Sequence, residues 1–177
     1  PVRQNCPVNS TSYAKASAAL RDKARGVTFY LRTTCATTDF AFSGPVYPGT
    51  YELSVLGEYS DVPGQEYLIN PALTVSADLA NLALNVKTAQ VSGVITLNGA
   101  APVRQNCPVN STSYAKASAV LRDKARGITF SLNTTCATTD FAFSGPVYPG
   151  TYEVSASGGY SDIPYQDYLA IRQLQLP

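Results

Sequence analysis

A long internal repeat constrains the fold of this chain more than any other feature of its sequence. The run PVRQNCPVNSTSYAKASA starts at Pro1 and starts again at Pro102, 101 positions later. Between Pro1–Ser54 and Pro102–Ser155 only five positions differ. A period of this length is that of a whole domain rather than of a solenoid repeat, so the 177 residues predict two tandem domains. We place these domains at residues 1–87 and 88–177.

Some of the differing positions show which side of a strand faces solvent. Tyr30 and Arg32 of the first copy are Ser131 and Asn133 in the second copy, a free change of polarity. The apolar residues interleaved with them stay apolar. Side chains of a strand alternate between its two faces. The pattern therefore predicts a strand whose inward residues are Val27, Phe29 and Leu31.

The stretch FAFSGPVYPGTYE is identical in both copies, as Phe40–Glu52 and Phe141–Glu153. Each half alternates apolar and polar residues, and a turn rich in proline and glycine lies between the halves. Proline fixes φ and lacks an N–H donor, while glycine allows the positive φ of tight turns. We therefore predict a central hairpin, with strands at Thr38–Ser43 and Thr50–Leu56 in the first copy.

Alternation at period two marks further strands along the chain. In chain order they cover Ala16–Arg21, Gly26–Thr33, Glu66–Val75, Ala80–Lys87 and Gln90–Leu97. Pro71 interrupts one of them and predicts an edge strand or a bulge there. The run AKASAALRDKAR, rich in alanine, is the stretch that could instead form a helix.

These strands predict an all-β fold of two tandem β-sandwich domains, each apparently short of one strand within this chain. The first copy lacks an opening strand like Gln90–Leu97, and the second lacks a last strand like Ala80–Lys87. A sandwich without one strand exposes unpaired backbone donors and acceptors. Two interpretations remain open: the chain was cut from a longer array, or neighbouring subunits donate the strands in a head-to-tail filament.

Composition excludes several classes of partner. The net charge of +1 provides no basic surface for nucleic acid or for an anionic membrane. No apolar run is long enough to span a membrane. The chain starts at Pro1 inside a repeat, without an initiator methionine or a signal peptide. We therefore expect it to be mature, processed or cut from a longer protein.

Four cysteines, at positions 6, 35, 107 and 136, allow three disulfide connectivities. The repeat favours Cys6–Cys35 and Cys107–Cys136, one bridge in each domain and each spanning 29 positions. Bridges of this kind indicate an oxidising, extracellular compartment. A metal site is the weaker alternative, because the chain has no C-x-x-C motif and no histidine.

Several motifs together resemble the carboxypeptidase regulatory-like domain, a transthyretin-like fold close to CnaB. They are the opening strand Val91-Ser92-Gly93, the pairs Phe40/Phe42 and Phe141/Phe143, and the turns Pro48–Tyr51 and Pro149–Tyr152. The resemblance implies a seven-stranded, Ig-like β-sandwich that serves as a spacer, stalk or adhesive module in secreted proteins. Two features depart from the family pattern: Asp140 runs directly into Phe141 without the usual turn, and the cysteine-bearing loop is an insertion.

The sequence carries no recognisable catalytic site, and we expect no enzyme, no cofactor and no bound metal. Without histidine there is no Ser/His/Asp or Cys/His nucleophile. The carboxylates Asp39, Glu52, Asp61 and Glu66 are scattered, and neither Asp61 nor Asp162 has the spacing of calcium ligands. The resemblance to CnaB raises a Lys–Asn isopeptide bond beside a glutamate. Lys15, Lys87 or Lys116 with Glu52 or Glu153 could fill those roles, but none of these residues is in the opening strand.

Tyrosine is the most prominent feature outside the predicted core, with twelve Tyr and no Trp. We expect Tyr47, Tyr51 and Tyr59 to lie near one end of the domain. Core packing, sugar stacking and subunit contact are the three interpretations, because tyrosine has both an apolar ring and a polar tip. The candidate interface or glycan-stacking residues are Tyr47, Tyr59, Tyr148 and Tyr160. Three sequons could carry N-linked glycan in a suitable host, at Asn9, Asn110 and Asn133.

Taken together, these features favour an extracellular structural tandem-repeat protein. It would be a stalk or filament subunit that pairs strands with copies of itself. The alternative is a carbohydrate-binding or adhesive module that recognises a surface polysaccharide.

Overall fold

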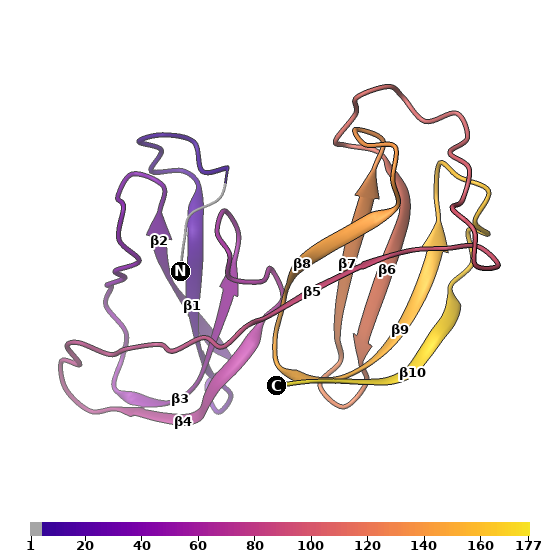
Figure 1. Cartoon of the computed structure of the whole chain (residues 1–177). Coiled ribbons are helices and arrows are strands. Elements are labelled where there is room, and N and C mark those ends of the chain that lie inside the picture. The colour runs from indigo at the N-terminus through magenta and orange to yellow at the C-terminus, as the bar shows by residue number, and fades with distance from the viewer. Residues whose placement is uncertain (1–4) are drawn as a thin grey trace. The chain divides into compact units, whose positions relative to one another are not determined.

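The computed structural model describes residues 5–177, and within that range the protein is all β, with ten strands and no helix. Every sheet is antiparallel. The chain divides into two compact units, which we name unit 1 (Pro1–Thr88) and unit 2 (Ala89–Pro177). Figure 1 shows the strands of each unit.

Unit 1 contains one four-stranded sheet with the order β2-β1-β3-β4. Its strands are β1 (Ala14–Asp22), β2 (Val27–Thr34), β3 (Gly49–Gly57) and β4 (Tyr67–Val75). Strands β1 and β2 form the predicted pair on either side of the RDKAR turn. The N–H of Gly26, at φ 67°, donates to the carbonyl of Asp22 and closes this turn. The helical alternative for AKASAALRDKAR is therefore wrong.

The small side chains of β1 explain why that segment is a central strand rather than a helix. Strand β1 pairs with β2 on one edge and with β3 on the other. Nearly all of its residues are buried. Alanine and serine allow a strand to be covered closely on both faces, so tertiary pairing overrides the helix preference of alanine. The core of unit 1 comprises Ala18, Leu20, Tyr51, Leu53 and Val75.

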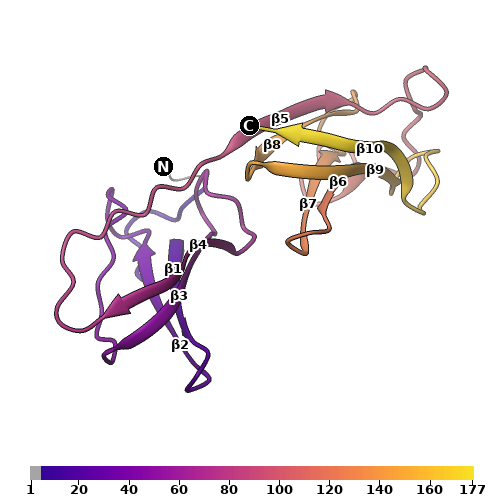
Figure 2. The same ribbon diagram turned by 90° about the horizontal axis from the view of Figure 1, so that it is seen from below.

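Unit 2 repeats this sheet, with the order β10-β9-β6-β7. The strands are β6 (Ala115–Asp123), β7 (Ile128–Thr135), β9 (Gly150–Gly158) and β10 (Tyr168–Leu176). Unit 2 also contains a two-stranded sheet of β5 (Ala89–Val94) and β8 (Ala142–Val147). Figure 2 shows β5 alongside β8. Strand β5 alternates as predicted, with its odd-numbered residues facing inward and its even-numbered residues exposed.

The predicted central hairpin is wrong, because the two halves of FAFSGPVYPGTYE lie in different sheets. In unit 2 the first half, β8, pairs with β5, whereas the second half, β9, pairs with β6 and β10. Both edges of β9 are therefore occupied, and no edge remains for β8. The turn that contains Pro149 is a corner where the chain changes sheets.

Two further predicted strands are absent from the described part of unit 1. The segment 40–47, identical in sequence to the β8 region, belongs to no sheet. The segment 80–87 is also unpaired and includes Asn81 at φ 58°, although Leu82, Leu84 and Val86 alternate inward as predicted. A strand needs a backbone partner, and neither segment has one among residues 5–177. The prediction of a seven-stranded fold short of one strand gives six strands in each unit. Within residues 5–177 unit 2 has six strands, but unit 1 has four.

The strand that contains Pro71 is an edge strand, as predicted. Strand β4 lies at one edge of its sheet, and its pairing with β3 shifts register between Tyr51 and Leu53 and again before Ser54. Its counterpart β10 shifts register in a similar way although it contains no proline. The irregularity therefore belongs to this edge of the sheet and does not require proline.

Candidate functional site

The same thirteen residues have two different environments in the two units. In unit 2 the segment Phe141–Glu153 begins with β8, and its Tyr148 side chain is 0% exposed. In unit 1 the identical segment Phe40–Glu52 leaves Tyr47 67% exposed. Because the sequences are the same, the difference in burial comes from what covers each segment.

Strand β5 is the element that pairs with the first half of this segment in unit 2. It pairs with β8 over six residues, from Ala89 opposite Val147 to Val94 opposite Ala142. Beneath this sheet Phe130 and Leu132 are buried, whereas the equivalent Phe29 and Leu31 of unit 1 are only partly buried. The exposed apolar surface of unit 1 therefore corresponds to the position that β5 occupies in unit 2.

This exposed surface forms a groove in unit 1, which we name the unit 1 groove. One wall is Phe40–Val46, the other is Leu79–Val86, and the floor is the face of the sheet that carries Ala16, Ala18 and Leu20. Two cavities lie between the walls, of about 500 Å³ and about 640 Å³. Each is in the size range of ligand-binding pockets.

The chemistry of the unit 1 groove suits an extended peptide. The residues that line the larger cavity include one ionisable side chain, Asp78, and those that line the smaller cavity include none. An anionic ligand would therefore lose its hydration without gaining an opposite charge, and a cation would find an opposite charge at Asp78 alone among these lining residues. A strand would bury apolar side chains against the floor and pair its backbone with the walls, as in β-strand addition.

Hydrogen bonding in unit 2 shows which backbone groups of the wall face this space. The N–H of Ile95 donates to the carbonyl of Phe141 at 3.0 Å. In an antiparallel ladder, hydrogen-bonded pairs alternate with non-hydrogen-bonded pairs. Phe143, Gly145 and Val147 therefore direct their backbone groups toward β5, and the same positions of unit 1 are Phe42, Gly44 and Val46.

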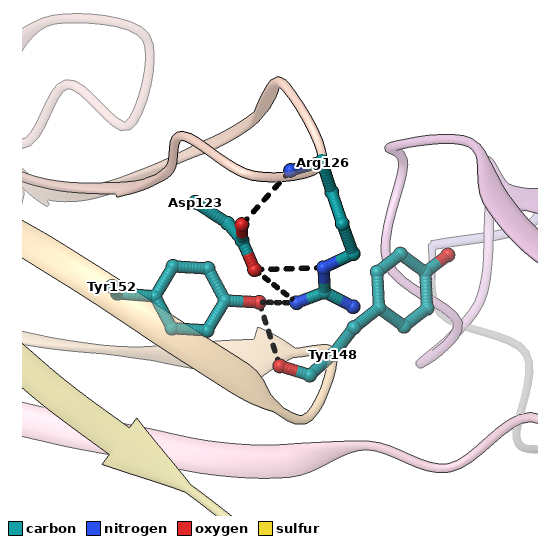
Figure 3. Close-up of polar contacts among 4 residues, drawn as sticks. All are labelled: Asp123, Arg126, Tyr148 and Tyr152. Carbon is teal, nitrogen blue, oxygen red and sulfur yellow. Dashed lines mark hydrogen bonds and ion pairs between the residues drawn. The ribbon is translucent and has the colours of Figure 1, made fainter.

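A polar cluster fixes the corner at which the chain of unit 2 changes sheets (Figure 3). The Arg126 guanidinium lies 2.7 Å from the Asp123 carboxylate and donates to the Tyr152 hydroxyl at 3.2 Å. The Tyr152 hydroxyl donates to the Tyr148 carbonyl at 2.7 Å. The cluster joins the β6–β7 turn to the corner, and this role is structural.

The same cluster keeps the Asp123 carboxylate ionised. Burial by itself would raise the pKa of Asp123, but the backbone N–H and the guanidinium of Arg126 hold that pKa below its ordinary value of 3.8. Unit 1 has the equivalent pair, with Arg25 3.1 Å from Asp22. The prediction missed this cluster, although the D-K-A-R spacing in both copies was a readable signal.

Lys15 and Lys116 are fully buried. The Lys116 ammonium donates to the Thr138 carbonyl at 2.8 Å and to the Asp140 carbonyl, and it lies 4.8 Å from the Phe141 ring centroid. Burial is the main cause that lowers the pKa of Lys116 below its ordinary value of 10.5. Lys15 makes the same contacts with Thr37, Asp39 and Phe40. Each lysine thus holds the loop that follows the second cysteine of its unit.

The isopeptide arrangement is not assembled. Glu52 pairs with Lys23 at 2.5 Å and Glu153 with Lys124 at 2.8 Å. Arg21 of β1 is the residue opposite Glu52 on β3, so Lys15 and Glu52 lie about six residues apart along the strands, or about 20 Å. Lys87 is exposed in the unpaired segment that leads into β5.

The structure separates the tyrosines that the sequence grouped together. Tyr47 precedes β3 and Tyr59 follows it, so they lie at opposite ends of a nine-residue strand rather than at one end of the domain. Tyr51 and Tyr148 are fully buried, and Tyr148 is therefore wrong as a glycan-stacking residue. Tyr160 is exposed and packs edge to face on Tyr114, with ring centroids 5.2 Å apart.

Unit 2 contains a surface hollow that is lined by aromatic and polar side chains. Its volume is about 530 Å³, and its lining includes Tyr114, Tyr160, Tyr165 and Asp167. Tyr165 is 84% exposed. Exposed aromatic rings beside a carboxylate are a surface on which a sugar ring could stack and form hydrogen bonds.

The remaining predicted residues lie at the surface or in bridges. Disulfides join Cys6 to Cys35 and Cys107 to Cys136. Asn9 and Asn110 are exposed in loops at φ 58°, and Asn133 is exposed on β7, where its amide oxygen accepts a hydrogen bond from Ser118 at 2.6 Å. All three side chains are therefore accessible at the surface.

Three of the carboxylates are engaged in local contacts. Glu66 pairs with Arg21 at 3.3 Å, Asp39 accepts a hydrogen bond from the Thr37 hydroxyl at 2.9 Å, and Asp162 accepts one from the Val103 N–H at 2.8 Å. Across residues 5–177 no three His, Cys, Asp or Glu side chains gather as metal ligands would. The same residues contain no helix that could cross a membrane.

Comparison with known proteins identifies no relative. No protein-family model, no curated protein and no solved structure matches this chain.

Proposed function

We propose that this chain is an extracellular structural tandem-repeat protein, a subunit of a stalk or filament assembled by β-strand pairing between copies. The observation that supports the proposal is that one sequence, present in both units, is paired in unit 2 and unpaired in unit 1. The segment Ala142–Val147 is a strand paired with β5, whereas Ala41–Val46 lies unpaired beside an apolar groove. An unpaired edge next to exposed apolar surface favours association with another chain.

The proposed fold of each unit is a transthyretin-like β-sandwich of the carboxypeptidase regulatory-like kind. The two-layer arrangement of β5 and β8 with the four-stranded sheet of unit 2 supports it. The two disulfides support secretion, because such bridges persist in oxidising compartments. A low net charge and a rigid, bridged β-structure suit a mechanical spacer better than a catalyst.

The test is assembly as a function of concentration, followed by sedimentation velocity and negative-stain electron microscopy. We expect the wild-type chain to form head-to-tail oligomers or filaments. Val46→Pro should weaken assembly, because proline removes an N–H that faces the missing strand. Val46→Ala is the matched control, since it shortens the side chain but keeps this donor. A chain that remains monomeric at every concentration and salt condition contradicts the proposal.

A second candidate function is carbohydrate binding by an adhesive module, which the tyrosine-lined hollow of unit 2 favours. Tyr165 and Asp167 would supply stacking and hydrogen bonds to a neutral sugar. A polysaccharide pull-down with the wild-type chain and with Tyr165→Ala distinguishes this function. Equal retention of both proteins, or no retention of either, argues against it.

A further inference from the structure

The strand-pairing function proposed above leaves open which strand enters the unit 1 groove. We propose that it is β5 of a second copy of this chain, antiparallel to Ala41–Val46 and in the register that β5 adopts with β8. The inference rests on that proposed function and makes it specific.

The register follows from the identity of the two acceptor segments. Ala41–Val46 has the same sequence, AFSGPV, as β8. In unit 2 Gly93 lies opposite Phe143, and a Cβ atom built on Gly93 would be 2.8 Å from the Phe143 ring. A side chain at position 93 would force this ring to move, so the close approach favours glycine there. In the unit 1 groove Gly93 of the incoming strand would face Phe42, and Val91 would face Gly44.

The unit 1 groove offers β5 more backbone partners than its place in unit 2. In unit 2 the sheet of β5 has two strands, so one edge of β5 is free of strand pairing. In unit 1 the wall contains Asn81, whose φ of 58° is left-handed, and from Leu82 to Val86 its alternate side chains turn inward with no strand partner among the described residues. A strand in the groove can pair with Ala41–Val46 on one edge and with Leu82–Val86 on the other. That second ladder favours transfer of β5 out of unit 2.

The link between the wall and β5 excludes β5 of the same copy. The wall ends at Val86, and β5 begins at Ala89, so Lys87 and Thr88 alone join them. An antiparallel return through two residues needs a primed turn with positive φ, which Asn or Gly provides and Lys-Thr does not. A parallel return needs a dozen residues or more. The donor is therefore a second copy.

Donation moves the unpaired edge from unit 1 of the recipient to unit 2 of the donor. When β5 leaves unit 2, Ala142–Val147 of the donor loses its partner, while unit 1 of the recipient gains one. The contact is heterologous, because a strand of one copy enters a different surface of the next, and such contacts extend into an open chain of subunits. Assembly should therefore protect Ala41–Val46 and expose Ala142–Val147.

Cysteine trapping in the full chain tests two things together: the register of β5 against Ala41–Val46, and whether this β5 comes from another copy. Ser92 lies opposite Ser144 in a non-hydrogen-bonded pair, where side chains approach closely. In the proposed contact Ser92 lies opposite Ser43. We would oxidise a mixture of light and ¹⁵N-labelled Ser43→Cys/Ser92→Cys chains and identify the linked peptides by mass spectrometry. The natural cysteines are all bonded and do not compete.

The expected product is a 43–92 disulfide that joins a light chain to a heavy chain. Ser92→Cys/Ser144→Cys is the control, which shows that the substituted chain folds and that oxidation occurs. Absence of the mixed product in a solution that contains assemblies overturns strand exchange and leaves the proposed function standing. A 43–92 disulfide found within single chains and never between chains also overturns strand exchange. Absence of assemblies under every condition overturns both proposals.

A peptide supplies a second measurement that needs no substitution in the protein. The peptide TAQVSGVITLN, residues 88–98, should enter the unit 1 groove of the wild-type chain and slow hydrogen exchange at Ala41–Val46 by about tenfold or more. The same peptide with Gly93→Val should have no effect, because its side chain meets Phe42. Equal protection by both peptides contradicts the proposed register.

Discussion

Tyr47 and Tyr148 are the same residue in the same thirteen-residue context, yet one is 67% exposed and the other is 0% exposed. Each packs edge to face on a phenylalanine of the neighbouring strand, at 5.7 Å between ring centroids. The contact with this phenylalanine is therefore shared, and the difference in burial comes from the wider surroundings of each ring. At the scale of the residue, burial is a property of the surroundings and not of the side chain.

This pair gives a prediction with its own internal control. Tyr148→Ala should lower the free energy of unfolding of unit 2 by about 3–5 kcal/mol, the cost of truncating a buried aromatic side chain. Tyr47→Ala should cost unit 1 less than about 1 kcal/mol, since this ring is already in water. Hydrogen exchange of β1 and β6 in the monomeric protein reports the two units separately. Equal costs would contradict the difference in burial between the two rings.

Among the elements, β5 and β8 determine the difference between the units. Four strands occur in both units with the same order and nearly the same register, and they depend on contacts within each repeat. Strand β8 exists where β5 pairs with it, and the same sequence is unpaired elsewhere. The pairing of this segment is therefore conditional on a partner strand.

Gly93 is the position at which this pairing can be broken. Gly93→Val should destabilise unit 2 by about 1–3 kcal/mol, the usual cost of overpacking, because the new Cβ atom meets the Phe143 ring. Ser92→Val points to the exposed face and should change stability by less than about 0.5 kcal/mol. Thermal unfolding with hydrogen exchange at β8 measures both effects. Tolerance of Gly93→Val would show that this glycine does not determine the register.

At the scale of the whole molecule, the chain is two units that each contain one disulfide and one buried lysine. The cysteine at the end of each bridged loop, Cys35 or Cys136, is buried beside the main sheet. Each bridge closes a loop of 29 positions, which should stabilise its own unit by about 3–4 kcal/mol in the chain-entropy model.

The two bridges should act independently. Cys107→Ser/Cys136→Ser should weaken unit 2 by about 3–4 kcal/mol, while exchange in β1 of unit 1 stays unchanged. Cys6→Ser/Cys35→Ser should do the reverse. Loss of both units from either double variant would show instead that the units fold as one cooperative block.

Local pattern was enough to predict several elements. Alternation identified β2, β5 and β7, and the inward faces of β5 and β7 are as predicted. In β2, Phe29 and Leu31 are partly buried as predicted, but Val27 is exposed, so its prediction as an inward residue is wrong. The RDKAR turn marked the β1–β2 pair, and Pro71 marked an edge strand. The repeat reduced three disulfide connectivities to the pairing observed. These features depend on residues close in sequence or on comparison between copies, so the sequence alone determines them.

The candidate site could not be read in the same way. FAFSGPV and YPGTYE are adjacent in sequence and look like a hairpin, but strand pairing is decided by residues far along the chain. Both edges of β9 are taken by β6 and β10, and β8 pairs with β5, 48 to 58 positions before it. The sequence by itself determined which residues can form strands and which face each one buries. The tertiary structure alone decided the partner of each strand, because identical segments are a paired strand where β5 is present and an open groove wall where it is absent.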